Sequence, residues 1–346
     1  MPAPRIQTTT VGSYPVPDWL VALPSEQALI DATRVVICTQ ENAGIDLVCD
    51  GELYRFDVNH PETNGMIEYF VQPMSGVRRE IGLAEWMSFK TQPGMEFRTK
   101  PSGIVVGPLG PGSLDLPTAF ARAKALATKP LKFTLTGPHM LSKMLLNTHY
   151  KDKAELAFAI ADVLAEQVKY IDAPVIQLDE ANLPGAADEW SWAAESINRV
   201  LRAIPTKPAV HLCFGNYGGQ TIQKGSWDKL IDYLNALHVD HIVMENAHRP
   251  PEELAVFRAL RPEIGFGLGV VDIKATEVES AEAVARAIER AEQTLGAGRV
   301  KYIHPDCGFW MLKRPIADAK IRALAKGRDL FEGRAPAPAA SASSAG

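Results

Sequence analysis

Cysteine is scarce in this chain, and neither sign of charge dominates it. The four cysteines among 346 residues are scattered, which excludes a disulfide-stapled secreted scaffold. The formal net charge is only −5, with acidic and basic residues mixed, which argues against a nucleic acid or an anionic membrane as a partner. No apolar run approaches the roughly 18 residues that span a bilayer, and the opening MPAPRIQTTT lacks the apolar segment of a secretory signal. These absences favour a cytoplasmic protein whose thiols are free to bind metal.

The hydrophobic residues, 46% of the chain, are sufficient for a globular core. No internal repeat and no linker-like change of composition divides the sequence. The last stretch, GRAPAPAASASSAG, is rich in Pro, Ala and Ser and has nothing to bury. We therefore expect one folded domain over residues 1–332 and a disordered tail over residues 333–346.

Eight short apolar or β-branched runs alternate with amphipathic helical patterns. The runs cover residues 8–14, 46–52, 132–138, 175–181, 209–215, 241–246, 266–272 and 300–308. This alternation predicts parallel strands joined by helical crossovers, and eight such units predict a (β/α)8 TIM barrel. The longest insertion, residues 53–131, lies between the second and third strands. The rival doubly wound sheet requires a GxGxxG turn after its first strand, where SYPVPDWL stands instead.

Polar side chains gather at the ends of most predicted strands. They are Ser13, Asp50, Glu52, Asp179, Glu180, His211, Cys213, Glu245, Asn246, Asp272, Asp306 and Cys307. Barrel enzymes build their active sites at the carboxyl ends of the strands, so we expect these side chains to meet at one rim.

The stretch HLCFGNYGG places a histidine and a cysteine two positions apart on one strand. His211 and Cys213 therefore point to the same face. Such a pair alone is more often packed in a core, but Cys307 and Glu245 end other predicted strands and would complete a tetrahedral zinc site. Thiolates with imidazole select zinc over magnesium or calcium. Two thiolates and a carboxylate suit activation of an incoming thiol better than ionisation of a bound water.

The other two cysteines have no predicted chemical role. Cys38 lies on an apolar helical pattern, and Cys49 lies inside a predicted strand. We expect both to be buried thiols.

Eight segments resemble the catalytic half of cobalamin-independent methionine synthase. They are TTTVGSYP, DGELYR, FTLTGPH, IQLDEANLPG, HLCFGNY, VMENAHR, GLGVVDIK and HPDCGF, in this order across nearly the whole chain. The resemblance implies a zinc-bearing (β/α)8 barrel that transfers a methyl group from 5-methyltetrahydrofolate to homocysteine. The family's N-terminal barrel has no counterpart here, so the chain looks like the single-barrel form.

The resemblance also implies roles for individual residues. It implies the zinc ligands His211, Cys213, Glu245 and Cys307. It implies that the loop Val11, Gly12 and Ser13 holds the homocysteine carboxylate, and that Glu52 and Asp179 hold its amino group. Arg98 falls near the folate-contacting stretch. Structural roles compete for three of these: a turn cap at Ser13, a helix cap at Asp179, and a surface pair of Glu52 with Arg55.

The chain departs from the family on the folate side. Lys274, in DIK, stands where the family has a proton-donating histidine, and a lysine needs desolvation or a nearby cation to titrate near neutrality. The stacking tryptophan after the TGP segment has no equivalent in TGPHMLSKMLL. Pro184 and Gly185 stand in place of a family carboxylate. HLCFGN is closer to the corresponding stretch of epoxyalkane:coenzyme M transferase.

Four functions follow from these patterns. The first is a zinc-dependent methyltransferase that methylates homocysteine or a similar amino-acid thiol, with 5-methyltetrahydrofolate or another donor, and with Lys274, Asp179 and Glu52 as its catalytic residues. The second is a zinc alkyltransferase resembling epoxyalkane:coenzyme M transferase; the two carboxylates, which suit an ammonium group, favour the first. A non-catalytic zinc barrel and a cofactor-free barrel decarboxylase are the third and fourth. Homo-oligomerisation and a partner protein that delivers the methyl group both stay open.

Overall fold

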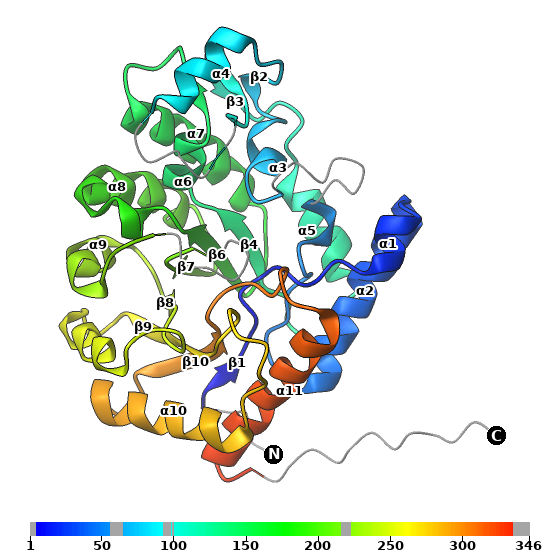
Figure 1. The fold of residues 1–346 in the computed structure, drawn as a ribbon, viewed down its shortest axis with the longest axis vertical. Coiled ribbons are helices and arrows are strands. Elements are labelled where there is room, and N and C mark those ends of the chain that lie inside the picture. The colour runs from blue at the N-terminus through cyan, green and yellow to red at the C-terminus, as the bar shows by residue number, and fades with distance from the viewer. Residues whose placement is uncertain (1–4, 56–64, 93–97, 99, 216–222, 335–346) are drawn as a thin grey trace.

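A computed structural model describes residues 5–55, 65–92, 98, 100–215 and 223–334. Its main feature is a curled parallel sheet with the strand order β1-β10-β9-β8-β7-β6-β4. The strands are β1 (Gln7–Thr8), β4 (Phe133–Thr136), β6 (Val175–Glu180), β7 (Lys207–Leu212), β8 (His241–Met244), β9 (Gly265–Val271) and β10 (Val300–Pro305). Figure 1 shows these strands following one another around the curl with helices outside them. The fold is α/β and TIM-barrel-like, as expected.

The second predicted strand, residues 46–52, does not form a regular strand. It makes isolated parallel bridges instead, pairing Leu47 with Thr9, Gly51 with Ser13, and Val48 with Leu131. Thr9 and Ser13 continue from the edge strand β1, and Leu131 precedes the other edge strand, β4. The segment thus lies between the two edges of the sheet.

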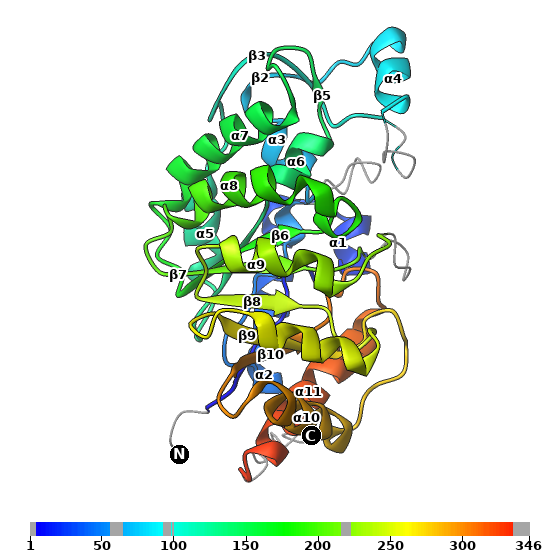
Figure 2. The same ribbon diagram turned by 90° about the vertical axis from the view of Figure 1, so that its left-hand side faces the viewer.

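The helices outside the sheet carry their apolar side chains on one face. They are α2 (Glu26–Ala43), α7 (Lys153–Val168), α8 (Trp190–Leu201), α9 (Ile231–Ala236), α10 (Ala281–Leu295), α11 (Arg314–Phe331) and the 3-10 helix η5 (Pro251–Ala259). In α10 the buried side chains are Val284, Ile288 and Ala291, at helical spacing. Ser280 caps the start of α10 by accepting the amide hydrogen of Ala283. Figure 2 shows α7, α8 and α9 stacked along one side of the sheet.

A second, smaller sheet lies beyond the main one (Figure 1). Its strand order is β2-β3-β5, with β2 (Ser75–Arg78) antiparallel to β3 (Ile104–Gly110) and β3 parallel to β5 (Leu146–Asn147). Near it are α3 (Glu68–Val71), α4 (Leu83–Lys90) and α5 (Leu116–Lys124). Most of these elements fall in the predicted insertion, but β5 follows β4, so the small sheet extends beyond residue 131. The remaining short elements are α1 (Asp18–Ala22), α6 (Pro138–Lys143), η1 (Leu53–Arg55), η2 (Leu183–Gly185), η3 (Ala187–Glu189) and η4 (Trp227–Leu230).

The expectation of two buried structural thiols was half right. Cys49 is buried, but Cys38 is exposed. Val36 and Ile37 supply the buried face of α2 at this turn, and each further helical residue rotates about 100°, which turns Cys38 outward. Residues 335–346 of the predicted tail lie outside the described residues. None of the described helices is long and apolar enough to cross a membrane.

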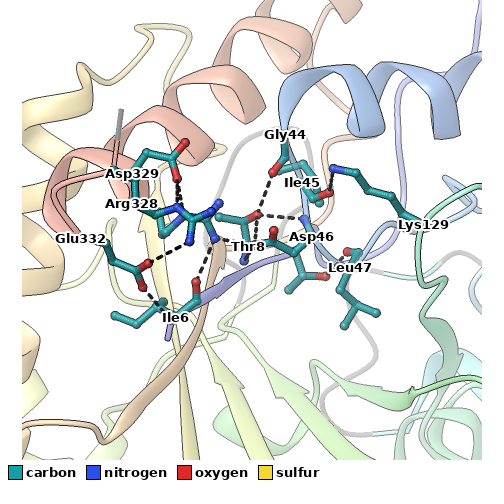
Figure 3. A network of polar contacts seen from close by, with 12 residues as sticks. Ile6, Thr8, Gly44, Ile45, Asp46, Leu47, Lys129, Arg328, Asp329 and Glu332 are labelled. Carbon is teal, nitrogen blue, oxygen red and sulfur yellow. Dashed lines mark hydrogen bonds and ion pairs between the residues drawn. The ribbon is translucent and has the colours of Figure 1, made fainter. Parts of the chain in front are cut away.

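A buried arginine on α11 ties the first strand to the bridging segment (Figure 3). Arg328 is 3% exposed; its Nη1 donates to the Ile6 carbonyl at 3.0 Å and pairs with Asp46. Asp46 in turn accepts hydrogen bonds from the amide and the hydroxyl of Thr8, at 2.9 and 3.0 Å. One ion pair thus joins the last helix, β1 and the start of the bridging segment.

Replacing Arg328 by Met should lower the free energy of unfolding by about 3 kcal/mol, because it leaves the partly buried Asp46 carboxylate without its cation and the Ile6 carbonyl without the arginine donor. Urea denaturation followed by circular dichroism measures this loss. The matched control is R202M, which removes an exposed arginine. The Nη1 atom of Arg202 lies 3.8 Å from Oε2 of Glu195, and such an exposed ion pair contributes little to stability. Equal urea midpoints for R328M and R202M would contradict the assigned role.

Candidate metal and substrate site

An imidazole and two thiols meet at the carboxyl ends of β7 and β10. The ligand atoms of His211, Cys213 and Cys307 all lie within 4.8 Å of one another, and the two sulfur atoms are 3.8 Å apart. His211 and Cys213 belong to β7 and the residue just after it, whereas Cys307 follows β10 in the sequence by two residues. The sequence spacing alone predicted the first pair, and the curl of the sheet brings the third group to it.

The donor atoms of this cluster fit a soft metal ion such as zinc. His211 donates from Nδ1 to the Val243 carbonyl at 3.0 Å, which leaves Nε2 as the free ring nitrogen. Nε2 is buried and meets no partner of acceptable hydrogen-bond geometry among the described residues. Buried polar atoms are rarely left unpaired, so a ligand is the natural partner of this nitrogen. An outer hydrogen bond that fixes the tautomer is also a usual feature of metal-binding histidines.

The two thiols differ in acidity. The hydrogen bond with Cys307 and burial raise the pKa of Cys213 well above its ordinary value. The hydrogen bond from Cys213 and the neighbouring His211 imidazole lower the pKa of Cys307, although burial opposes this. Burial would lower the pKa of His211, but the Cys307 thiol and Asp179 outweigh it and raise that pKa.

Glu245, the fourth expected ligand, makes two other contacts in this structure. It follows β8 and is fully buried. One carboxylate oxygen, Oε2, accepts the Phe214 amide hydrogen at 2.8 Å, and Oε1 lies 2.6 Å from Nζ of Lys274. The cluster whose ligand atoms lie together in the described residues therefore holds His211, Cys213 and Cys307 but not Glu245. Glu245 contacts the residue that follows Cys213, and both its oxygens have protein partners.

Asp306 orders the loop that carries Glu245. This carboxylate is buried and accepts the amide hydrogens of Asn246, Ala247 and His248 at 2.7–2.9 Å. Burial and the nearby Glu245 raise the pKa of Asp306 to about 7, although the three amides oppose the rise. Because Asp306 precedes Cys307, one turn fixes both a thiol and the backbone after β8.

The loop Val11–Ser13 lies against Glu52 and against the turn that carries Cys307. A Cβ added at Gly12 would collide with Oε1 of Glu52, so only glycine permits this approach. A Cβ added at Gly308 would likewise collide with Oγ of Ser13. The structure therefore brings Gly12 and Ser13 between Glu52 and the residue that follows Cys307.

Glu52 is held in a strained and buried position. Its φ of +58° is the only positive φ of a non-glycine residue in the described part of the chain, and such a conformation costs roughly 1–2 kcal/mol. Its Oε1 accepts from the Thr134 hydroxyl and lies 3.2 Å from Nη1 of Arg55. The pair with Arg55 exists, as the structural alternative supposed, but both residues are buried rather than on the surface. Strain of this kind concentrates at functional sites.

Asp179 lies beside His211, its partner across the β6–β7 register. Burial raises the pKa of Asp179 to about 7; the His211 imidazole opposes this shift and Glu52 adds to it. Nε2 of Gln177 donates to Asp179 at 2.7 Å and to the Val11 carbonyl at 3.0 Å, while Nζ of Lys132 donates to Gln177 at 2.7 Å. A buried polar network therefore joins Asp179 to the Val11–Ser13 loop.

Arg98 is engaged away from these groups. Its guanidinium pairs with Glu68 and Ser102, near the small sheet, and its Nε donates to the Lys100 carbonyl at 3.0 Å. The structure gives this residue no contact with the other expected site residues in the described part of the chain. The Gly-Asn pair of HLCFGN runs into residues 216–222, which lie outside the described residues.

A buried histidine occupies the position after the TGP segment. His139 lies between two carboxylates, 3.1 Å from Glu180 and 2.8 Å from Glu189, and its ring is 4.7 Å from that of Trp192. Burial would lower the pKa of His139, but the two carboxylates raise it. Lys143 also pairs with Glu189, at 2.8 Å. An aromatic ring and a carboxylate are therefore present beside His139, but they come from Trp192 in the first turn of α8 and from Glu189 at the end of η3.

The sequence did not predict the buried polar residues that hydrogen-bond Glu52 and Asp179 or each other. Gln177 and Thr134 lie inside strands and Lys132 precedes one. Gln177 and Thr134 fall within the family-like segments IQLDEANLPG and FTLTGPH, but no role was assigned to them. A further signal was the presence of polar side chains inside otherwise apolar runs, as in VIQLDE and KFTLT.

The comparisons with known proteins agree with this geometry. Residues 6–327 match the family model described as "Cobalamin-independent synthase, Catalytic domain". The methionine synthase of Thermococcus kodakarensis is 32% identical over 95% of this chain and 94% of its own length. That of Sulfurisphaera tokodaii is 30% identical over 94% of this chain and 92% of its own length.

A solved structure is similar over nearly the whole chain. It is a B12-independent methionine synthase from Shewanella sp. W3-18-1 in complex with selenomethionine, 25% identical, with a TM-score of 0.78 over 96% of this chain and 98% of that one. Family model, sequence relatives and fold all agree. The chain belongs to the cobalamin-independent methionine synthase family, a family of methyltransferases.

Proposed function

We propose that this protein methylates the sulfur of homocysteine, with zinc as its metal and 5-methyltetrahydrofolate as the methyl donor. The observation that carries the proposal is the cluster of His211, Cys213 and Cys307, whose buried Nε2 lacks a partner. The cluster lies beside a loop and two carboxylates that suit an amino acid. In this reading residues 46–51 take the place of the eighth strand of a (β/α)8 barrel.

The metal would be held by His211, Cys213 and Cys307, with Glu245 as the fourth protein ligand before substrate binds. When bound there, zinc supplies a positive charge that keeps a thiol deprotonated at neutral pH without an external base. The two cysteine thiolates balance the charge of the dication, so the site does not favour a bound hydroxide. Tetrahedral sites of this donor set are typical of zinc.

The amino-acid part of homocysteine would lie between the Val11–Ser13 loop and two buried carboxylates. The backbone amides and the Ser13 hydroxyl suit its carboxylate, and Glu52 and Asp179 suit its ammonium group. Burial raises the pKa of Asp179 to about 7, and the ammonium group of the substrate beside it would lower this pKa and keep Asp179 ionised. Coenzyme M carries a sulfonate at the corresponding end, which these carboxylates would repel. The complex of the Shewanella relative with selenomethionine is consistent with an amino-acid ligand.

Lys274 is better suited to supply charge than to donate a proton. Burial would lower its pKa, but the Glu245 carboxylate outweighs this and raises it above the ordinary lysine value. A proton donor near neutrality requires the opposite shift. On the donor side, the ring of His139, whose pKa is raised against the effect of burial by the Glu180 and Glu189 carboxylates, lies 4.7 Å from that of Trp192.

The direct test is methionine formation. Zinc-loaded protein incubated with homocysteine and 5-methyltetrahydrofolate should release methionine, measured by mass spectrometry. Activity with coenzyme M and an epoxyalkane, in the absence of methionine formation, would favour the alternative zinc alkyltransferase and overturn the proposal.

The ligand set is tested by metal analysis. Replacing Cys307 by Ser should remove most of the bound zinc, because a hydroxyl is a far weaker zinc ligand than a thiolate. The matched control is C38S, which changes an exposed thiol on α2 and should keep one zinc per chain. Zinc retained in full by C307S would show that the ligand set is wrong.

The role of Glu52 is tested by kinetics. Replacing it by Gln removes a charged partner worth roughly 1.5–3 kcal/mol, so kcat/KM for homocysteine should fall by about 10–100-fold while bound zinc stays unchanged. E166Q, on the exposed face of α7, is the control. An unchanged dependence of the rate on homocysteine concentration in E52Q would exclude Glu52 from the substrate site.

A further inference from the structure

The ion pair between Lys274 and Glu245 is almost fully buried and lies beside the residue that follows Cys213. The side chains are 3% and 0% exposed, and Nζ lies 2.6 Å from Oε1. Lys274 follows β9 and Glu245 follows β8, so neighbouring strands of the sheet present the two groups to each other. The cation acts on Cys213 as well, since Cys213 contributes to the raised pKa of Lys274.

Both partners are held in place by the backbone. The Lys274 amide donates to Oδ1 of Asp272 at 2.8 Å, and Oδ2 of Asp272 lies 3.0 Å from Nδ1 of His248. On the other side, the Phe214 amide fixes Oε2 of Glu245 at 2.8 Å. The Oε1 atom is therefore the one that can exchange partners while Oε2 stays anchored.

A zinc ion bound at the cluster would thus compete with Lys274 for the same Glu245 oxygen, Oε1. As a zinc ligand it would leave Lys274 without a partner, and as the partner of Lys274 it would leave one position at the metal open. A buried carboxylate with neither partner would be costly, because an unpaired buried charge destabilises the protein by several kcal/mol.

We propose that Lys274 is a positioning residue that receives Glu245 when the substrate thiol occupies the fourth position at the metal. The inference rests on the proposed zinc-thiol function and deepens it. Two cysteine thiolates already balance a zinc dication, so a bound carboxylate and a bound substrate thiolate would each add one negative charge. Lys274 cancels one of these charges and holds the carboxylate aside. In this positioning role Lys274 does not need to donate a proton, unlike the histidine that the family resemblance implies at this position.

The experiment uses the full chain loaded with cobalt(II), whose absorption spectrum reports coordination. The two cysteine ligands give a thiolate charge-transfer band by themselves, and an increase of this band on adding homocysteine reports the bound substrate thiolate. Four forms are compared: wild type, K274M, E245Q and the double variant. K301M is the matched control, because Lys301 is exposed on β10. Zinc affinity is measured in parallel by competition with a chromophoric chelator.

K274M should bind zinc about tenfold more tightly and homocysteine about tenfold more weakly than wild type, because Glu245 then has only the metal as a partner. In the E245Q background the same substitution should change neither affinity, since the competing carboxylate is gone. K274R, which keeps the cation, should remain close to wild type. K274Q replaces K274M if K274M does not fold.

Two results would overturn the inference. One is equal effects of K274M with and without Glu245; the other is unchanged homocysteine affinity in K274M, or in K274Q if K274M is unfolded. Failure of the underlying function gives a different result: homocysteine at any concentration leaves the thiolate charge-transfer band of the wild-type cobalt protein unchanged.

Discussion

Buried charge at the carboxyl ends of the strands is the constraint on which this structure depends. Parallel strands bring their carboxyl ends to one rim, and this chain places several carboxylates, two thiols and an imidazole there. Each of these must be paired inside the protein or by a ligand, because an unpaired buried charge is costly. Arg55 pairs with Glu52, Gln177 with Asp179, backbone amides with Asp306, and Lys274 with Glu245.

One buried polar atom at this rim, Nε2 of His211, has no protein partner of acceptable geometry among the described residues, and it indicates the candidate metal site. His211 keeps a buried nitrogen without an acceptable partner beside two thiols 3.8 Å apart. An apolar core would have no reason to gather these groups, whereas a metal ion pairs with all three at once. The strained backbone of Glu52 and the close approach of Gly12 to its carboxylate lie in the same region as this cluster. The proposed metal site and the proposed amino-acid site thus form one connected region.

The donor side differs from the thiol side in how its parts are assembled. The family's tryptophan and carboxylate are missing from their expected segments, but Trp192 and Glu189 come together with His139 from a later part of the chain. Lys274, in place of a proton-donating histidine, pairs with Glu245 and keeps its charge. Under the proposed function, the chain keeps the His-Cys-Cys cluster that would activate a thiol and supplies the surrounding charges from different residues.

The sequence by itself determined the alternation of strands and helices, the pairing of His211 with Cys213 on one strand face, and the family. Local periodicity and the two-residue repeat of a strand are sufficient for these. Only the tertiary structure decided that residues 46–51 bridge the sheet edges irregularly, that Cys38 is exposed, and that Lys274 takes the carboxylate of Glu245. These depend on which side chains approach across β8, β9 and α11, and a burial or an ion pair between distant segments has no local sequence signature. Side-chain neighbours from separate strands are set by the curl of the sheet, which no single segment encodes.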